Sequence, residues 1–83
     1  MKLSIVVPVY NEKNTILEVI ERVTETGQAA EIIIVDDFST DGTRYILRRI
    51  DSAHTTVLYH DKNRGKGAAL RTGFQRATGD IVI

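Results

Sequence analysis

Two patterns of apolar positions alternate along the chain. Short runs of consecutive apolar, mostly β-branched residues, such as LSIVVPV and EIIIVD, are typical of strands buried on both faces. Between these runs, apolar residues recur at the three- and four-residue spacing of amphipathic helices. The predicted strands are Leu3–Val9, Glu31–Asp36, 55–60 and 80–83, and the predicted helices lie within 14–27, 41–51 and 65–79.

Local signals support the three helices. Thr15 and Glu18 fit a capping box at the start of the first helix, and Gly27 suits its left-handed stop. Asp41 is predicted to cap the second helix, and Gly79 to end the third. The residues predicted to face the core are Ile16, Ile20 and Val23, then Ile46, Leu47 and Ile50, then Leu70, Phe74 and Ala77.

This alternation of strand and helix predicts an α/β, Rossmann-like domain with a mostly parallel sheet in the order βαβαβαβ. The helical crossovers should be right-handed. The sequence stops within the fourth strand, DIVI, without a cap or turn. We therefore expect residues 1–83 to be the truncated N-terminal part of a larger domain. An unpaired edge on the last strand would promote self-association.

Composition narrows the function classes. Lysine plus arginine equals aspartate plus glutamate, 11 each, so no global positive field points to nucleic acid. The chain has no cysteine, which excludes disulfides and thiolate metal sites. It shows no signal peptide and no apolar run long enough to span a bilayer. We expect a cytoplasmic protein, and an extended form with a lipid-linked acceptor would work at the cytoplasmic face of a membrane.

Three polar loops follow the first three predicted strands: PVYNE, DDFSTDG and DKNRGKG. Ligands of open α/β sheets bind at the carboxyl ends of the strands, so these loops should share one rim. Pro8 lacks an N–H donor, and we expect strand hydrogen bonding to stop there. Tyr10 could offer its ring to a base or sugar, and Glu12 a carboxylate to amine or hydroxyl donors. The alternative is an ordinary strand end with a turn at Asn11.

The pair Asp36–Asp37 ends the second strand. Since side chains alternate along a strand, the two carboxylates should project to opposite sides. One can face the crevice, where an acceptor-only carboxylate suits the N–H groups of a nucleobase or ribose hydroxyls. Asp41 and Thr43 are explained by capping of the second helix. A calcium loop starting at Asp37 is excluded, because Arg48 stands where the pattern needs a glutamate.

Arg64 and Lys66 lie among glycines at the start of the third helix. Backbone N–H groups and positive side chains there suit an anion such as diphosphate, and the alternative is a solvated turn. The spacing matches neither a Walker A motif nor the dinucleotide fingerprint. His54 and His60 have no partner at metal-ligand spacing, so each is predicted to be a surface or internally hydrogen-bonded histidine.

Together, VVPVYNE, EIIIVDDFSTDGT, NRGKGAALRTG and ATGD resemble the family 2 glycosyltransferases, inverting enzymes with a GT-A fold. The resemblance covers essentially the whole chain. Within the family it is most similar to polyprenyl-phosphate sugar synthases, typified by dolichyl-phosphate mannose synthase. It implies transfer of a sugar from a UDP- or GDP-sugar donor to an acceptor such as polyprenyl phosphate.

The same resemblance implies roles for individual residues. The counterparts of Pro8, Tyr10 and Glu12 line the nucleotide pocket, and the backbone near Val35 helps to frame it. Two more residues complete the implied site: Asp37, which contacts the base or ribose, and Lys66, which lies near the nucleotide. Asp36 is then expected to be structural.

Two departures from the family limit these expectations. Phe38 stands where family members often have glycine. An Asp-x-Asp motif holding Mg²⁺ or Mn²⁺ is expected after the strand that begins at Asp80, but the sequence stops at Ile83. We therefore assign no catalytic residue and no metal ligand, and expect the chain alone to be inactive.

The alternative is a truncated, non-catalytic module for nucleotide binding or folding. A receiver or flavodoxin-like domain, which shares the strand–helix alternation, is disfavoured. The paired acids of a receiver follow its first strand, whereas these follow the second.

Overall fold

The computed structural model describes residues 2–25, 31–79 and 81–82. Strands and helices alternate along the whole described chain, in the order that the sequence predicts. They are β1 (Leu3–Val9), α1 (Ile16–Glu25), β2 (Glu31–Asp36), α2 (Thr43–Leu47), β3 (Thr55–Tyr59), α3 (Lys66–Arg76) and β4 (Ile81–Val82). Gly27, the predicted stop of the first helix, lies outside the described residues.

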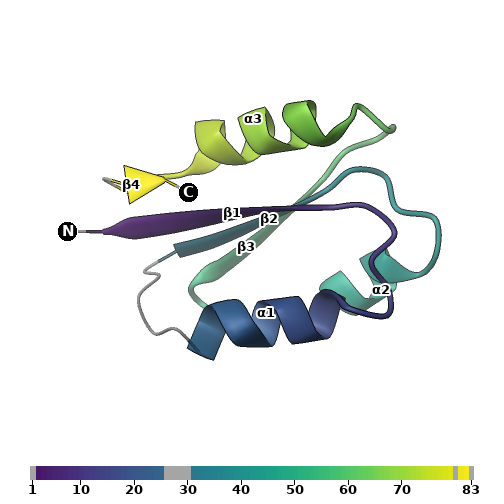
Figure 1. Ribbon diagram of the computed structural model, residues 1–83, viewed down its shortest axis with the longest axis horizontal. Coiled ribbons are helices and arrows are strands. Elements are labelled where there is room, and N and C mark those ends of the chain that lie inside the picture. The colour runs from purple at the N-terminus through teal and green to yellow at the C-terminus, as the bar shows by residue number, and fades with distance from the viewer. Residues whose placement is uncertain (1, 26–30, 80, 83) are drawn as a thin grey trace.

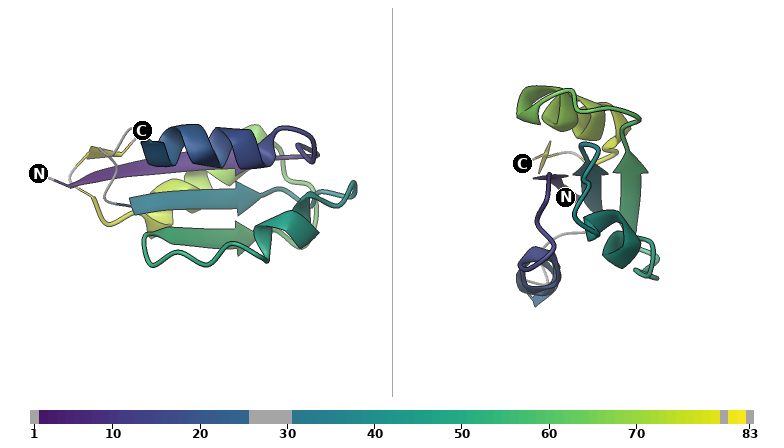
Figure 2. Two further views of the ribbon diagram at one scale, coloured as in Figure 1. Left: turned by 90° about the horizontal axis from the view of Figure 1, so that it is seen from below. Right: turned by 90° about the vertical axis from the view of Figure 1, so that its right-hand side faces the viewer.

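The strands form one parallel sheet in the order β3-β2-β1-β4. Helices α1 and α2 cover one face of the sheet and α3 covers the other (Figures 1 and 2). The strand order reverses direction after β3, because β4 pairs on the far side of β1. The predicted Rossmann-like α/β fold is confirmed. Among the described residues, no helix has the length and apolar character needed to cross a bilayer.

Strand β2 is the centre of the core, and its side chains alternate between two apolar clusters. Ile32 and Ile34 pack with Val9, Ile16 and Leu47 on the side of α1 and α2. On the opposite side, Ile33 and Val35 of β2 pack with two residues of β1 and α3, Val6 and Ala69. Each buried isoleucine, leucine or valine in these clusters contributes about 1.5–3 kcal/mol through burial. Burial on both faces explains why the middle of this strand, IIIV, is continuously apolar.

Pro8 does not end strand β1, so this prediction was wrong. Its Cα is in register with Val35, and Val9 is in register with Asp36. The carbonyl of Val9 then accepts the N–H of Asp37 at 2.8 Å, which continues the ladder past the strand itself. A proline removes one donor only, and pairing continues on the side that does not need that donor.

The starts of the first two helices differ from prediction. The Thr15 hydroxyl donates to Glu12 Oε2 at 2.9 Å, and the Ile16 N–H donates to the Glu12 carbonyl at 2.8 Å. Glu12 therefore organises the first turn in place of the predicted Thr15–Glu18 capping box. In α2 the cap position is Gly42, at φ 103°.

Helix α2 is shorter than predicted and has only 5 residues. After Leu47 the chain continues in tighter turns, in which Arg49 and Ile50 donate to carbonyls three residues back. Ile50 still packs against the core on this path, as the sequence indicates.

Phe74 was predicted to face the core, but it is 46% exposed. The buried residues of α3 are Ala69 and Gly73, and Leu70 and Ala77 pack beside them. A Cβ at position 73 would lie 2.3 Å from Val6 Cγ1, so only glycine allows this approach of α3 to β1. Close packing therefore selects small residues and turns the larger Phe74 outward.

A polar cluster fastens the amino-terminal ends of β1 and β2 to the segment after α3. Glu31 Oε1 accepts hydrogen bonds from the Ser4 hydroxyl at 2.6 Å and the Thr78 N–H at 2.9 Å. The Gly79 N–H donates to Ser4 Oγ at 2.9 Å. A Cβ on Gly79 would lie 2.4 Å from that oxygen. Gly79 therefore allows a close approach to β1, whereas α3 itself ends at Arg76.

The fit of α3 on β1 predicts that Gly73→Ala destabilises the protein. The added methyl would overlap Val6, and overpacking of a filled core costs about 1–3 kcal/mol. Urea unfolding should show this loss, and Val6→Ala in the same chain should restore part of it. Gly67→Ala is the matched control, because its Cβ meets only Arg71 Nη1 at 3.6 Å on the exposed face. Equal stability of the two single variants would contradict this packing.

The polar cluster predicts an acid-dependent loss of stability. Hydrogen bonds from Ser4 and Thr78 lower the pKa of Glu31 below its ordinary value of 4.5. A lowered pKa stabilises the fold above that value, and this stabilisation disappears as pH falls through the folded-state pKa. Glu31→Gln should therefore be less stable than the parent at pH 7, with a gap that narrows below about pH 4.5.

Unfolding midpoints measured from pH 7 to pH 3 test this expectation. Glu21→Gln, on the exposed surface of α1, is the control and should show no such gap. A Glu31→Gln curve parallel to that of the parent across the whole range would contradict the assignment.

Candidate functional site

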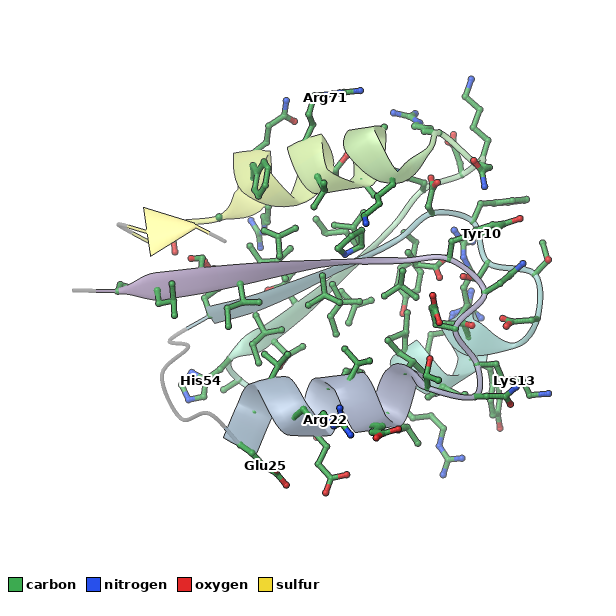
Figure 3. All side chains as sticks on the ribbon, in the orientation of Figure 1. Tyr10, Lys13, Arg22, Glu25, His54 and Arg71 are labelled. Carbon is green, nitrogen blue, oxygen red and sulfur yellow. The ribbon has the colours of Figure 1, made fainter. Side chains whose placement is uncertain are left out.

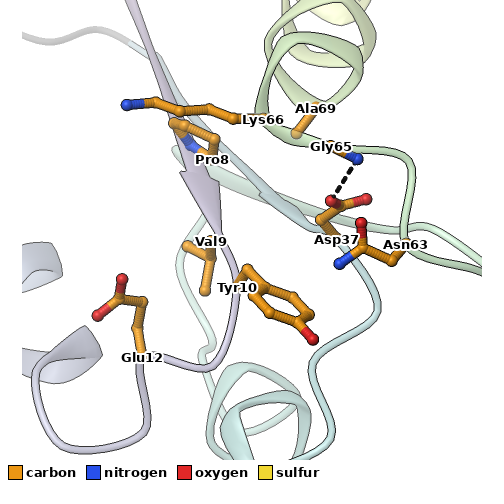
Figure 4. A pocket seen from close by; sticks show the side chains of 9 residues that line it. All are labelled: Pro8, Val9, Tyr10, Glu12, Asp37, Asn63, Gly65, Lys66 and Ala69. Carbon is orange, nitrogen blue, oxygen red and sulfur yellow. Dashed lines mark hydrogen bonds between the residues drawn. The ribbon is translucent and has the colours of Figure 1, made fainter.

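A pocket of about 370 Å³ lies at the carboxyl ends of β1 and β2, beside the start of α3. Its volume falls within the usual range for small-molecule sites. The end of the sheet that carries Tyr10 is opposite the end that carries the exposed His54 (Figure 3). The side chains around the pocket are shown in Figure 4, and its lining residues are Pro8, Val9, Tyr10, Glu12, Asp37, Asn63, Gly65, Lys66 and Ala69.

Most of the residues singled out in the sequence meet here. Pro8, Tyr10 and Glu12 reach the pocket from β1 and the loop after it, Asp37 from the end of β2, and Lys66 from α3. Val35 is fully buried in the cluster under α3 and is not among the lining residues. Its backbone can frame the site only through the strand that holds Asp37.

The loops after β1 and β2 are fastened to each other by hydrogen bonds. The Asn11 N–H donates to Ser39 Oγ at 2.9 Å, and the Thr40 N–H donates to Asn11 Oδ1 at 2.8 Å. The Glu12 N–H donates to Thr43 Oγ1 at 3.1 Å. These contacts fix the backbone that carries Tyr10 and Glu12 into the pocket.

Asp41 strengthens the same junction. Its Oδ2 accepts the Lys13 N–H at 3.2 Å, and its Oδ1 accepts the Thr43 N–H at 3.0 Å. Thr43 is the first residue of α2, so Asp41 does bond to the helix start, although Gly42 holds the cap position. The hydrogen bond from the Thr43 hydroxyl, followed by those from the backbone, lowers the pKa of Asp41.

The backbone conformation at Phe38 is one that favours glycine. Its φ is +64°, a left-handed conformation that side chains other than those of Asn and Asp rarely adopt. The Phe38 ring compensates by stacking on the guanidinium of Arg44 at 5.1 Å, and Tyr59 lies 5.3 Å from the same cation. Phe38 therefore combines a left-handed backbone with an aromatic contact to Arg44.

Asp36 is buried and structural, in line with the sequence. Its Oδ2 accepts Arg44 Nε at 2.6 Å and the Ser39 N–H at 3.0 Å. Arg44 also donates from Nη2 to the carbonyl of His60. Because Asp36 is 0% exposed, this cation offsets the cost of a buried carboxylate and ties α2 to the sheet.

Asp37 projects to the opposite side, as predicted, and is also almost fully buried. Its Oδ1 accepts hydrogen bonds from His60 Nδ1 at 2.9 Å and from the Arg64 N–H at 2.8 Å. Its Oδ2 accepts the Gly65 N–H at 2.8 Å. Burial alone would raise the pKa of Asp37, but the bonds from His60 and the two backbone groups lower it.

These bonds limit what Asp37 can offer a ligand. An ionised carboxylate has about four acceptor positions, and the three internal donors leave one, on Oδ2. Two backbone N–H groups before α3, those of Arg64 and Gly65, are occupied by Asp37. The anion site predicted there therefore has to depend on the first turn of α3 and on Lys66.

A divalent metal does not fit the described residues. Within 2–25, 31–79 and 81–82, no three histidine, cysteine, aspartate or glutamate residues cluster as a metal ligand set. Of the two acids that line the pocket, Asp37 is largely occupied and Glu12 bonds to Thr15. Three oxygen ligands for Mg²⁺ are therefore not assembled by these residues.

Sequence reasoning missed four pocket residues that the fold brings in, Val9, Asn63, Gly65 and Ala69. It also missed the support that His60 gives to Asp37. Gly65 has φ 94°, so the position before α3 requires glycine. The turn signal in NRGKG indicated this loop, but no spacing rule connects it to Asp37 almost thirty residues earlier.

The family comparison agrees with this architecture. Residues 4–83 match the model of the family described as glycosyl transferase family 2. The match covers nearly the whole chain and all three loops that form the pocket. The chain therefore belongs to glycosyl transferase family 2.

Proposed function

We propose that this chain provides the donor-nucleotide site of a glycosyltransferase that uses a UDP- or GDP-sugar. One observation carries the proposal: the ends of β1 and β2 and the start of α3 form a single pocket with a hydrogen-bond acceptor, an aromatic ring and a lysine. A site for a nucleoside diphosphate needs hydrogen-bond acceptors for the N–H groups of the base and a positive charge beside the diphosphate. Asp37 with Tyr10 can supply the first, and Lys66 the second.

The base would bind beside Asp37. The remaining acceptor position on Oδ2 can take one N–H, and the Tyr10 ring, 46% exposed, can stack on a base or sugar. Uracil presents a single imide N–H at its pairing edge, whereas guanine presents N1–H beside an N2 amino group. The number of free acceptor positions favours a uridine nucleotide.

The diphosphate would bind at the start of α3. The first N–H groups of a helix lack intrahelical partners and attract anions, and Lys66 is the first residue of this helix. Lys66 is exposed and lines the pocket, so its ammonium group is free to move onto a phosphate. Glu12, on the other wall, suits sugar or ribose hydroxyl donors.

Sugar transfer also needs a metal ion and a catalytic base. We propose that, in a longer form of the protein, other residues would hold Mg²⁺ or Mn²⁺ to neutralise the leaving diphosphate and would supply a base for the acceptor's proton. The proposed acceptor, a polyprenyl phosphate as in dolichyl-phosphate mannose synthases, rests on motif similarity. We expect the chain alone to transfer no sugar and to self-associate through its open sheet edge.

A non-catalytic binding or folding module is the second candidate. It is favoured by the absence of a metal-ligand cluster within the described part of the chain. The two candidates differ for longer forms of the protein. Sugar transfer by an extended protein supports the enzyme, whereas nucleotide binding without transfer by that protein supports the module.

We expect UDP to bind saturably at the pocket and Lys66→Ala to weaken binding by about tenfold, the usual effect of losing one charge-assisted hydrogen bond. Amide NMR shifts during titration should locate the site at Tyr10, Asn63 and Gly65. Lys62→Ala is the matched control, because Lys62 is exposed in the same loop and does not line the pocket. Equal losses in both variants would indicate a nonspecific charge effect.

We further expect UDP to bind about tenfold more tightly than GDP, since one donor of guanine would remain unpaired. Titration calorimetry with both diphosphates at one Mg²⁺ concentration measures the ratio. Uridine and guanosine, which lack the phosphates, are the controls for the base contribution. Equal or tighter binding of GDP would refute the single-acceptor account of Asp37.

A further inference from the structure

His60 follows β3 and is 6% exposed, although it lies beside a polar rim. Its backbone N–H donates to the carbonyl of Asp36 at 2.8 Å, which continues the sheet ladder beyond β3. The ring is not among the pocket-lining residues. His60 is therefore fixed behind the pocket wall rather than presented to a ligand.

Both nitrogens of the ring have partners. Nδ1 lies 2.9 Å from Asp37 Oδ1, and Nε2 lies 2.9 Å from the Thr72 hydroxyl oxygen in the middle of α3. Two backbone N–H groups also donate to Asp37, and these hydrogen bonds help to lower its pKa. The ionised carboxylate can only accept, so the proton of its contact with His60 belongs to Nδ1.

The Thr72 hydroxyl can either donate to His60 Nε2 or accept a hydrogen bond from it. It lies 3.0 Å from the carbonyl of Ala68 and can give its one proton either to that oxygen or to Nε2. A neutral His60 accepts this proton at Nε2, whereas a doubly protonated ring donates to Thr72, which then donates to Ala68. Nδ1 carries a proton in both arrangements.

We propose that His60 is the positioning residue of this site. Its Nδ1–H fixes the Asp37 carboxylate, and Asp37 in turn fixes the Arg64–Gly65 turn that forms the pocket wall before α3. The Thr72 hydroxyl bonds to the other ring nitrogen, Nε2, so His60 connects Asp37 to the middle of α3. The consequence for ligand binding rests on the function proposed above, whereas the consequence for the turn does not.

Two substitutions separate positioning from simple filling of space. His60→Asn retains an amide N–H close to the place of Nδ1, and His60→Leu retains volume without a donor. In the ligand-free protein, His60→Leu should lower the hydrogen-exchange protection of the Arg64 and Gly65 amides about tenfold. This is the effect of losing one hydrogen bond. His60→Asn should retain that protection, and the amides of Ile33 and Ile34 should be the internal reference in both variants.

Equal behaviour of the two variants at Arg64 and Gly65 would overturn the proposal. If His60→Leu does not fold, the nitrogen-15 shifts of the wild-type ring decide instead. A protonated Nδ1 supports the proposal, and a bare Nδ1 overturns it.

UDP affinity is the readout in the presence of ligand. It should fall about tenfold in His60→Leu and be restored in His60→Asn. A wild-type protein that binds no UDP would refute the proposed function, and the exchange data would still decide the role of His60. An unchanged UDP affinity in His60→Leu would show that ligand binding does not need the hydrogen bond from His60 to Asp37. It would overturn the proposed effect of His60 on binding.

Discussion

The rest of the structure depends on how two adjacent buried carboxylates are compensated at the end of β2. Asp36 and Asp37 point to opposite faces of the sheet, and each has almost no exposed surface. Asp36 is paired with Arg44 of α2, and Asp37 with His60 and the turn before α3. Since an uncompensated buried charge costs several kcal/mol, these partners have to stay in place for the fold to be stable.

This constraint also shapes the pocket. Compensating Asp36 fixes the loop after β2, which is hydrogen-bonded to the loop that carries Tyr10 and Glu12. Compensating Asp37 fixes the turn that begins α3 and carries Lys66. The walls of the pocket are therefore ordered before any ligand arrives, which reduces the conformational entropy that binding would cost. In this chain, the paired acids therefore organise the loops that form the pocket.

The sequence predicts most of this fold because periodicity distinguishes buried strands from amphipathic helices. The prediction fails where tertiary packing determines which residues are buried, as at Phe74. Helix α3 lies so close to Val6 that only Gly73 fits between them, and Phe74 is turned outward. At the site, spacing placed the three loops on one rim but could not show that Asp37 already has three donors. His60 was predicted to be either a surface or an internally hydrogen-bonded histidine. The structure shows the second, with partners that only the folded sheet brings together.

The most direct test of the central claim is a crystal structure of the chain grown with UDP. We expect the uracil N3–H to donate to Asp37 Oδ2, the base or ribose to contact Tyr10, and the diphosphate to lie between Lys66 and the first turn of α3. The Arg64 and Gly65 amides should stay on Asp37. UDP bound at another place, or a diphosphate that displaces Asp37 from those two amides, would contradict it.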